Sequence, residues 1–368
     1  MLHLTLFFTR GVSLHTWAQN GSLEREVALY LRLQQQKGVQ ISFITYGEKT
    51  DLRYRDRLQG IEILCNHWNL SARIYEQLIP LLHKRALSRA TLIKTNQTNG
   101  AEVALRAARF WHKPLLARCG YMWSDLMRSG GRLEEAKRAY AIERTVFTHA
   151  RGVVVTTPLM KEYALKNHGV LDERVHVIPN FVLTEIFKPG KTQPVPNRVC
   201  FIGRLSEEKN LFSLVQACTG LGVDLHFIGE GHLSAALQER AKELGVQLTL
   251  RGNIQHSQLP AEIRQSALFA LVSPHEGHPK SLLEAMACGV AVLGANSPGI
   301  REQIVHGETG WLVKTDAESI RAGIRHLLAN ASLRERLGRN ARRFIEENYS
   351  LDRIVEMEYA LYQEIVKR

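Results

Sequence analysis

The sequence lacks the motifs of several large enzyme classes. It has no Walker A sequence, no G-x-S-x-G elbow and no G-x-G-x-x-G after the first apolar run. These absences argue against nucleoside triphosphatases, α/β-type serine hydrolases and dinucleotide oxidoreductases. The 15 histidines include no H-E-x-x-H and no helical i, i+4 pair of ligand type, so metal catalysis has little support. We therefore expect neither a metal nor a cofactor.

Long apolar runs and paired cysteines are also missing. No stretch approaches the roughly 18 apolar residues of a membrane span. The first residues, MLHLTLFFTR, have no basic leader and predict a β-strand better than a signal peptide. The five cysteines are odd in number and show no C-x-x-C spacing, which is typical of reduced core thiols. These features predict a cytoplasmic protein.

Charge of one sign is in excess, with a formal net charge of +12. Such a surface attracts anions in general: nucleic acid, acidic lipid headgroups or phosphorylated substrates. The chain has no block of five or six like charges and no aromatic-basic repeat, so nucleic acid as a partner is unsupported.

A chain of 368 residues accommodates two domains, and its pattern alternates strand and helix twice. The proline-rich stretch 187–198 is the best linker, so we predict one α/β domain over 1–190 and a second over 191–349, each a doubly wound parallel sheet. The expected strands are 2–8, 39–46, 60–65, 91–95, 114–119, 152–157 and 175–179, then 199–203, 224–229, 246–252, 268–273, 290–294 and 310–313. The expected helices are 23–36, 71–87, 100–111, 132–149, 158–167, 209–218, 232–244, 257–267, 279–289 and 298–305, with further helices from about 317, 332 and 350; 9–22 is expected to be a loop.

The stretch Leu271–Gly289 concentrates the polar chemistry of the second half. A strand leads into a loop with Glu276, and a helix is predicted to begin at Pro279 with Glu284 on it. The first amides of such a helix form an anion site, which a lysine reinforces, while two carboxylates suit sugar hydroxyls. A nucleotide sugar has both chemistries. The remaining candidate contacts to it are Gly277, His278, Lys280, Ser281 and Leu282.

Two further strand ends in this half carry candidates, since ligands bind beyond the carboxyl ends of parallel strands. Arg204 and Lys209 follow Gly203 and are able to reach one pyrophosphate; the alternative is a solvated basic pair beside two glutamates. Glu230 lies in a G-E-G turn, where glycine allows a close backbone approach to a ligand or simply ends the strand.

In the first half, Gly21 and Ser22 precede a predicted helix. This helix start is either a second phosphate cradle or an ordinary cap with Ser22 accepting an amide hydrogen bond. The spacing alone favours the cap.

Four segments together, EGHPKSLLEAMACG, GRLSEEKN, IGEGH and NGSLERE, resemble the retaining glycosyltransferases of family 4. The resemblance covers almost the whole chain and is strongest over 198–315. It implies the GT-B fold: two Rossmann-like domains that face one another across a cleft, with a last helix, 350–368, that packs back on the first.

The resemblance also implies roles. Glu276 and Glu284 match the E-x7-E pair of the donor site, with Glu276 on the transferred sugar and Glu284 on the ribose. Arg204 and Lys209 would hold the diphosphate, joined by amides after Glu276. Gly21 and Ser22 would close on it from the first domain, and no metal would be needed.

One departure from the family concerns the loop after PLLARC, where many members carry a histidine near the donor sugar. This chain continues with Gly120 to Asp125 and offers no histidine there. Arg118 is the candidate substitute, and Tyr121 or Trp123 either stacks on an acceptor sugar or is an ordinary packing aromatic.

The sequence therefore predicts a retaining, metal-independent hexosyltransferase. It would move a sugar from a nucleotide diphosphate donor, uridine-linked on family frequency, to a glycan or lipid-linked acceptor in cell-envelope, exopolysaccharide or lipopolysaccharide synthesis. The basic charge suits peripheral docking on an anionic membrane, the inner face of the plasma membrane. The alternatives are a sugar-nucleotide epimerase of the same architecture and a non-catalytic nucleotide-binding module.

Overall fold

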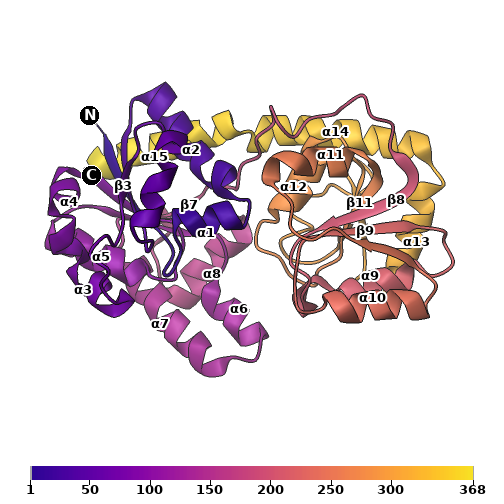
Figure 1. Cartoon of the computed structure of the whole chain (residues 1–368), viewed down its shortest axis with the longest axis horizontal. Coiled ribbons are helices and arrows are strands. Elements are labelled where there is room, and N and C mark those ends of the chain that lie inside the picture. Colours follow the sequence, from indigo (N-terminus) through magenta and orange to yellow (C-terminus); the bar gives the residue numbers. More distant parts are fainter. Residues whose placement is uncertain (1, 368) are drawn as a thin grey trace. The chain divides into compact units, whose positions relative to one another are not determined.

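The computed structural model describes residues 2–367 and divides the chain into two compact units. The first unit contains the residues up to Pro179 and those from Ile354 onward, and the second is Asn180–Arg353 (Figure 1). Among the described residues, no helix combines the length and apolarity that crossing a bilayer requires.

The first unit is built on a parallel sheet of seven strands in the order β3-β2-β1-β4-β5-β6-β7. The central strands are buried along their whole length, which requires helices on both faces. The strands are β1 (His3–Phe7), β2 (Gln40–Ile44), β3 (Glu62–Leu64), β4 (Leu92–Thr95), β5 (Leu115–Cys119), β6 (Gly152–Val155) and β7 (Val175–Val177). The helices are α1 (Leu14–Gln19), α2 (Leu23–Lys37), η1 (Lys49–Leu58), α3 (Ala72–Leu82), α4 (Lys84–Arg89), α5 (Ala101–Phe110), α6 (Trp123–Ser129), α7 (Leu133–His149), α8 (Pro158–His168), η2 (Asp172–Arg174) and α15 (Leu351–Lys367), whose first three residues belong to the second unit.

The second unit repeats this plan with six parallel strands in the order β10-β9-β8-β11-β12-β13. Its strands are β8 (Val195–Ile202), β9 (Asp224–Ile228), β10 (Gln247–Leu250), β11 (Ser266–Leu271), β12 (Val292–Ala295) and β13 (Trp311–Val313). Its helices are η3 (Glu207–Lys209), α9 (Leu211–Ala217), α10 (Ser234–Glu243), η4 (His256–Gln258), α11 (Leu259–Arg264), α12 (Lys280–Ala287), α13 (Ala317–Leu328) and α14 (Ala331–Tyr349). Two Rossmann-like parallel sheets confirm the predicted fold class.

The differences from the predicted elements are local. Short helices α1 and α6 occupy stretches predicted as loops, and α1 is started by a capping box between Ser13 and Thr16. The helix predicted over 71–87 is two helices that meet at His83. The helix predicted over 298–305 is wrong: these residues form turns, and Gly299 has a left-handed φ of +85°.

The segment 180–190 belongs with the second unit, although the sequence placed it in the first domain. Val182 exchanges backbone hydrogen bonds with Tyr349 and Leu351, 2.8 and 3.1 Å long. The Arg342 guanidinium donates to the carbonyl oxygens of Thr184 and Phe187. The prolines of the linker therefore follow the boundary between the units instead of marking it, and β8 begins inside the linker, at Val195.

The last helix, α15, packs on the first unit through a buried ion pair, which confirms the predicted return of the chain. The Lys94 ammonium, on β4, lies 2.7 Å from the Glu358 carboxylate and 2.9 Å from the Tyr362 hydroxyl. The side chains of Lys94 and Glu358 are 0% and 2% exposed. Burial lowers the pKa of Lys94, and the Glu358 charge opposes that shift.

Replacing Lys94 by methionine is expected to destabilise the first unit by about 3–5 kcal/mol, because Glu358 then stays buried without its cation. The free energy of urea unfolding, followed by circular dichroism, measures the loss. The control is Lys166→Met on α8, whose partner Glu162 is an exposed neighbour 3.8 Å away; that pair is expected to contribute no more than about 1 kcal/mol. Equal losses in both variants would contradict a structural role for the buried pair.

Candidate functional site

The site of the second unit lies at the carboxyl ends of β8, β9 and β11. These strands are neighbours in the sheet, so the loops that follow them meet at one edge. The loop after β8 carries Arg204 and Lys209, the loop after β9 carries Glu230, and the loop after β11 carries Glu276.

Glu276 and Lys209 form an ion pair across 67 residues of sequence. The Lys209 ammonium lies 2.7 Å from Glu276 Oε1, and the Ser273 hydroxyl donates to the same oxygen at 2.7 Å. The two charged side chains are 19% and 13% exposed, so the pair is accessible to a ligand but screened on most sides. The structure thus brings together a cation and a carboxylate that the sequence assigned to one ligand.

Lys209 is held in place by the residue that follows it. Asn210 has a left-handed φ of +56°, and its side-chain amide donates to the carbonyl oxygens of Val272 and Thr315 at 3.1 and 2.8 Å. Because Val272 leads out of β11, this amide joins the loop of the lysine to the loop of the carboxylate. The geometry of the pair is therefore set by the backbone.

The loop that carries Glu276 rests on the turn after β12. The Glu276 amide donates to the Pro298 carbonyl oxygen at 2.9 Å, and the Ser297 hydroxyl donates to Ser273 O at 2.7 Å. A Cβ atom on Gly299 would lie 2.0 Å from the Glu276 carbonyl oxygen. Only glycine permits this approach, which explains why a turn replaces the predicted helix.

Arg204 is separate from the ion pair. Its side chain is 74% exposed and lies 3.5 Å from the Glu208 carboxylate. The sequence offered a phosphate-binding pair or a solvated pair for Arg204 and Lys209, and the structure divides the two residues: Lys209 contacts Glu276, whereas Arg204 has the environment of a solvated cation.

The glycines of the β8 and β9 loops let two backbones touch. A Cβ on Gly229 would lie 2.1 Å from the Gly203 carbonyl oxygen, and a Cβ on Gly231 would lie 2.1 Å from that of Leu205. The Leu205 amide also donates to the Glu230 carbonyl oxygen at 3.0 Å. Gly229 and Gly231, in the loop after β9, thus allow close contact with the backbone of the loop after β8. The Glu230 carboxylate accepts a 3.0 Å hydrogen bond from the side-chain amide of Asn253.

The helix α12 begins one residue later than predicted, with Pro279 as its N-cap. No side chain caps this end, so its first amides, from Lys280, Ser281 and Leu282, are presented beside the Glu276 loop. A helix start without a side-chain cap is suited to an anion.

Glu284 lies one turn further along α12 and is almost fully buried. Its Oε1 lies 2.8 Å from Nε2 of His256, and both side chains are 4% exposed. The His256 ring also packs on Phe187, with 4.8 Å between centroids. His256 was not predicted as a site residue, because a histidine in a polar loop 28 residues upstream of Glu284 gives no signal of this contact in the sequence.

His278, in the loop between Glu276 and α12, contacts α14 and the start of the second unit. It is 6% exposed, and its ring stands edge-on to Tyr349 at the end of α14, with centroids 5.2 Å apart. Its carbonyl oxygen accepts from the Asn180 side chain at 2.9 Å. The described contacts of His278 are therefore packing contacts within the second unit.

In the first unit, Gly21 and Ser22 precede α2, with Gly21 at a φ of +66°. Ser22 is the N-cap residue, but its side chain makes no capping hydrogen bond and donates instead to the Trp17 carbonyl oxygen at 3.4 Å. The ordinary serine cap that the spacing favoured is not formed, so the start of α2 is also a helix end without a side-chain cap.

Arg118 and Tyr121 flank the exit of β5. The Arg118 amide donates to the Thr95 hydroxyl at 2.9 Å, and the Gly120 amide donates to Gln97 Oε1 at 2.8 Å, so the exits of β4 and β5 are joined. Tyr121 is partly buried, and its carbonyl oxygen accepts from the Cys119 thiol at 3.0 Å.

The start of α6 is held by a buried carboxylate that sequence analysis missed. Glu143, on α7 and 0% exposed, accepts from the amides of Trp123 and Ser124 at 2.7 and 3.2 Å and from the Ser124 hydroxyl at 2.5 Å. Burial raises the pKa of Glu143, and these hydrogen bonds oppose the rise. His168 Nε2 lies 3.5 Å from the same carboxylate.

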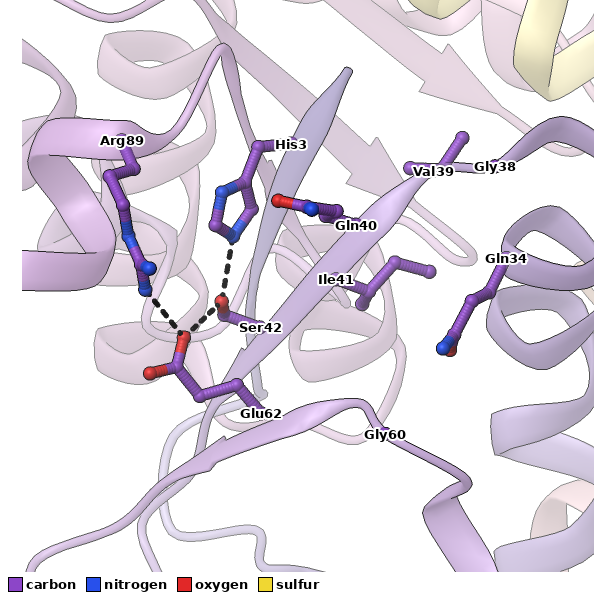
Figure 2. A pocket seen from close by; sticks show the side chains of 10 residues that line it. All are labelled: His3, Gln34, Gly38, Val39, Gln40, Ile41, Ser42, Gly60, Glu62 and Arg89. Carbon is purple, nitrogen blue, oxygen red and sulfur yellow. Dashed lines mark hydrogen bonds and ion pairs between the residues drawn. The ribbon is translucent and has the colours of Figure 1, made fainter. Parts of the chain in front are cut away.

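A pocket of the first unit lies at the opposite edge of its sheet from these strand exits, among the amino-terminal ends of β1, β2 and β3. It is a hollow of about 490 Å³ (Figure 2). Ser42 Oγ lies 3.0 Å from His3 Nε2 and donates to Glu62 at 2.8 Å, and Arg89 pairs with the same carboxylate. These groups satisfy one another, so the pocket presents no charge that lacks a partner.

No group of three histidine, cysteine, aspartate or glutamate side chains that would hold a metal ion is found over residues 2–367. All five cysteines are free and buried.

The fold defines the class of protein. The whole chain superimposes on GT-B glycosyltransferase structures, and 99% of it matches sucrose-phosphate synthase from Thermosynechococcus elongatus with a TM-score of 0.79 at 18% identity, over 99% of that chain. It matches HepE from Anabaena, solved in complex with UDP and glucose, with a TM-score of 0.76 at 17% identity over 99% of this chain and 100% of that one.

Two family models match adjoining parts of the chain. "Glycosyltransferase Family 4" matches residues 23–186, and "Glycosyl transferases group 1" matches residues 184–344. The chain belongs to the family 4 glycosyltransferases, which confirms the resemblance found in the sequence.

The curated relatives are distant. An uncharacterized glycosyltransferase of Methanocaldococcus jannaschii is 27% identical over 61% of this chain, and alpha-maltose-1-phosphate synthase of Mycolicibacterium smegmatis is 26% identical over 61% of it. The chain spans 61% and 66% of the lengths of these two relatives.

Gly299→Ala is expected to destabilise the second unit more than the matched change Gly307→Ala. Both glycines have positive φ, +85° and +76°, but a Cβ at Gly307 meets nothing within 4 Å. The shared backbone strain is about 1–2 kcal/mol, and the clash with the Glu276 carbonyl should add about 1–3 kcal/mol. Urea unfolding measures the loss of unfolding free energy in the two variants. Equal losses would show that the Glu276 loop does not depend on the close contact between Gly299 and the Glu276 carbonyl oxygen.

The stability of the first unit should fall as the pH is lowered from about 6.5 towards 4, because burial, with help from Arg144, lowers the pKa of His168 to about 4. The unfolded chain then takes up the proton first. Neither ring nitrogen of His168 makes a hydrogen bond within the described residues, so phenylalanine suits this site. His168→Phe should reduce the loss of unfolding free energy between about pH 7 and 5 by about 1–2 kcal/mol. The exposed His149→Phe is the control, and identical pH profiles for His168→Phe and the wild-type protein would contradict the assignment.

Proposed function

We propose that the protein is a retaining hexosyltransferase that uses a nucleotide diphosphate sugar, with UDP as the nucleotide, and needs no metal ion. The observation that carries the proposal is the Lys209–Glu276 pair beside the start of α12. A cation and a helix start address a diphosphate, and the adjacent carboxylate addresses sugar hydroxyls. The proposal of UDP is supported by HepE, which was solved with UDP-glucose.

Lys209 and the first amides of α12 would act mainly on the leaving group. The nucleoside diphosphate gains negative charge as the glycosidic bond breaks, so a preorganised cation and helix end stabilise the transition state more than the ground state. The developing charge is then met by protein groups, and no metal ion is required for it. Arg204 joins this set only if its exposed side chain turns towards the phosphates.

Glu276 is proposed to accept hydrogen bonds from the transferred sugar. In the structure it is bound to Lys209 and Ser273, so donor binding exchanges the lysine contact for a phosphate contact and frees carboxylate capacity for hydroxyls. Glu284 is proposed to take the ribose hydroxyls, with His256 orienting its carboxylate. Gly203, Glu230, Gly277, His278, Lys280, Ser281 and Leu282 complete the proposed donor-side set.

The acceptor is proposed to be a glycan or lipid-linked molecule of the cell envelope or of an exported polysaccharide. This is supported by the structural likeness to a lipopolysaccharide outer core galactosyltransferase, WaaB. Gly21 and Ser22 are proposed to contribute to the phosphate grip, and Arg118 and Tyr121 to acceptor binding. The buried free cysteines suit a reducing compartment, so we propose a cytoplasmic enzyme that docks on the membrane surface.

Lys209→Met is expected to lower kcat for sugar transfer by about 100- to 1,000-fold, because it removes one charge-stabilising donor from the leaving group. Release of nucleoside diphosphate from the donor, in the presence of acceptor, measures this. The control is Lys242→Met at the exposed end of α10, which should keep wild-type activity. Full activity of Lys209→Met would refute the proposed role.

A thermal-shift panel of nucleotide sugars identifies the donor. A ligand that binds only the folded protein adds about 2.7 kcal/mol of stability at 100 times its Kd. UDP-sugars are expected to raise Tm more than GDP- or ADP-sugars. The absence of any shift with every nucleotide sugar would overturn the proposal.

Product analysis in the absence of acceptor distinguishes the transferase from an epimerase. Recovery of the donor sugar unchanged excludes an epimerase, whereas a changed free donor would overturn the proposal.

A further inference from the structure

The first unit carries a surface that is both apolar and basic, formed by α3, α4 and α5. These helices pack on one another, and Figure 1 shows them together at one end of that unit. Four large apolar side chains are exposed on this α3–α5 face: Trp68 at 39%, Ile74 at 47%, Leu81 at 56% and Phe110 at 54%.

The helix α3 is apolar on two sides. Tyr75 and Ile79 are buried against the unit, whereas Ile74 and Leu81 are exposed. The two exposed residues are seven positions apart, about two turns, and therefore lie on the same side of the helix. The apolar side of α3 is thus wider than the part that packs on the unit, and its outer edge is exposed next to the polar side that carries Arg73 and Gln77.

Side-chain contacts connect the other exposed groups to this helix. The Trp68 ring lies 5.5 Å from His83, where α3 meets α4, and Trp111 Nε1 donates to the Pro80 carbonyl oxygen at 2.9 Å. Phe110 packs against Trp111 with centroids 5.4 Å apart. These contacts place Trp68 and Phe110 near the carboxyl-terminal end of α3, where Leu81 is exposed.

This surface is strongly basic. Residues 67–113 contain eight lysines and arginines, of which only Lys94 is buried, and two acidic residues, Glu76 and Glu102. Both glutamates lie 2.7 Å from Arg10, whose single positive charge offsets one of their two negative charges. The side chains of Arg73, Lys84, Arg85, Arg106 and Arg109 are exposed around the apolar groups.

We propose that the α3–α5 face docks on an anionic lipid bilayer, with its apolar side chains in the headgroup and upper acyl region and its cations on the lipid phosphates. Aromatic and aliphatic groups ringed by lysine and arginine are the composition of interfacial membrane helices. Nucleic acid would not explain the exposed aliphatic residues, and a second copy of this chain would bring like charges together. The inference deepens the proposed function, on which it rests for the membrane-linked acceptor.

Sedimentation with phosphatidylglycerol-containing vesicles, and with vesicles of phosphatidylcholine alone, tests the proposal on the full chain. Wild-type protein is expected to bind the anionic vesicles, less at high salt, and to bind the neutral ones weakly. Each cation near such a surface contributes about fivefold to partitioning. The triple variant Lys84→Gln, Arg85→Gln, Arg109→Gln should therefore bind roughly 100-fold more weakly, and Ile74→Ser with Leu81→Ser should reduce binding at unchanged charge.

The charge-matched control is Arg336→Gln, Arg339→Gln, Arg343→Gln on the exposed side of α14, which should bind as the wild type. The proposal is overturned if anionic vesicles are not bound, if both triple variants lose binding equally, or if the face variants instead abolish RNA binding or dimerisation without affecting vesicles. Release of nucleoside diphosphate without vesicles is measured in the same variants and should be unchanged. If the protein binds anionic vesicles but has no transferase activity, the proposed function is refuted. The proposal that the α3–α5 face docks on a bilayer is then still supported.

Discussion

The ion pair between Lys209 and Glu276 is the contact on which the site of the second unit depends. Its two residues follow β8 and β11, neighbouring strands far apart in the sequence, so the pair forms only because the parallel sheet brings those strand ends together. Asn210 and Gly299 hold the loop backbones on either side of it. The sheet thus provides position and the two loop contacts provide orientation, which is the preorganisation that the proposed stabilisation of a leaving diphosphate requires.

The sequence predicted both sheets because buried parallel strands are apolar runs separated by amphipathic helices, a local signal that survives in one sequence. It also led to Lys209 and Glu276, since strand ends in such a sheet are known places to search. Arg204 shows the limit of that argument: spacing made it equivalent to Lys209, but the turn of η3 directs only the lysine to Glu276, while Arg204 stays 74% exposed. The spacing of two residues in the sequence limits which groups their side chains are able to reach, but the backbone conformation decides in which direction each side chain points.

His256 and Glu143 could not be found from the sequence for a different reason. Each contacts a residue about 20 to 30 positions away, through a buried hydrogen bond with no periodic pattern. The glycines illustrate a related ambiguity. A glycine at a strand end indicates a close backbone approach but does not say what approaches, and at Gly229, Gly231 and Gly299 the neighbour is a carbonyl oxygen of another loop. These glycines shape the site without being shown to touch a ligand.

Two lysine–glutamate pairs of the chain have the same N–O distance but differ in how deeply they are buried, and this difference suits them to different roles. Lys94 and Glu358 meet at 2.7 Å with 0% and 2% exposure, and the Tyr362 hydroxyl completes the set. Opening that pair would leave a charge in the interior, so it can only hold α15 in place. Lys209 and Glu276 also meet at 2.7 Å, but with 19% and 13% exposure. Solvent reaches this pair, and in the proposed function the donor phosphate takes the place of the carboxylate beside Lys209, an exchange that the buried pair does not allow.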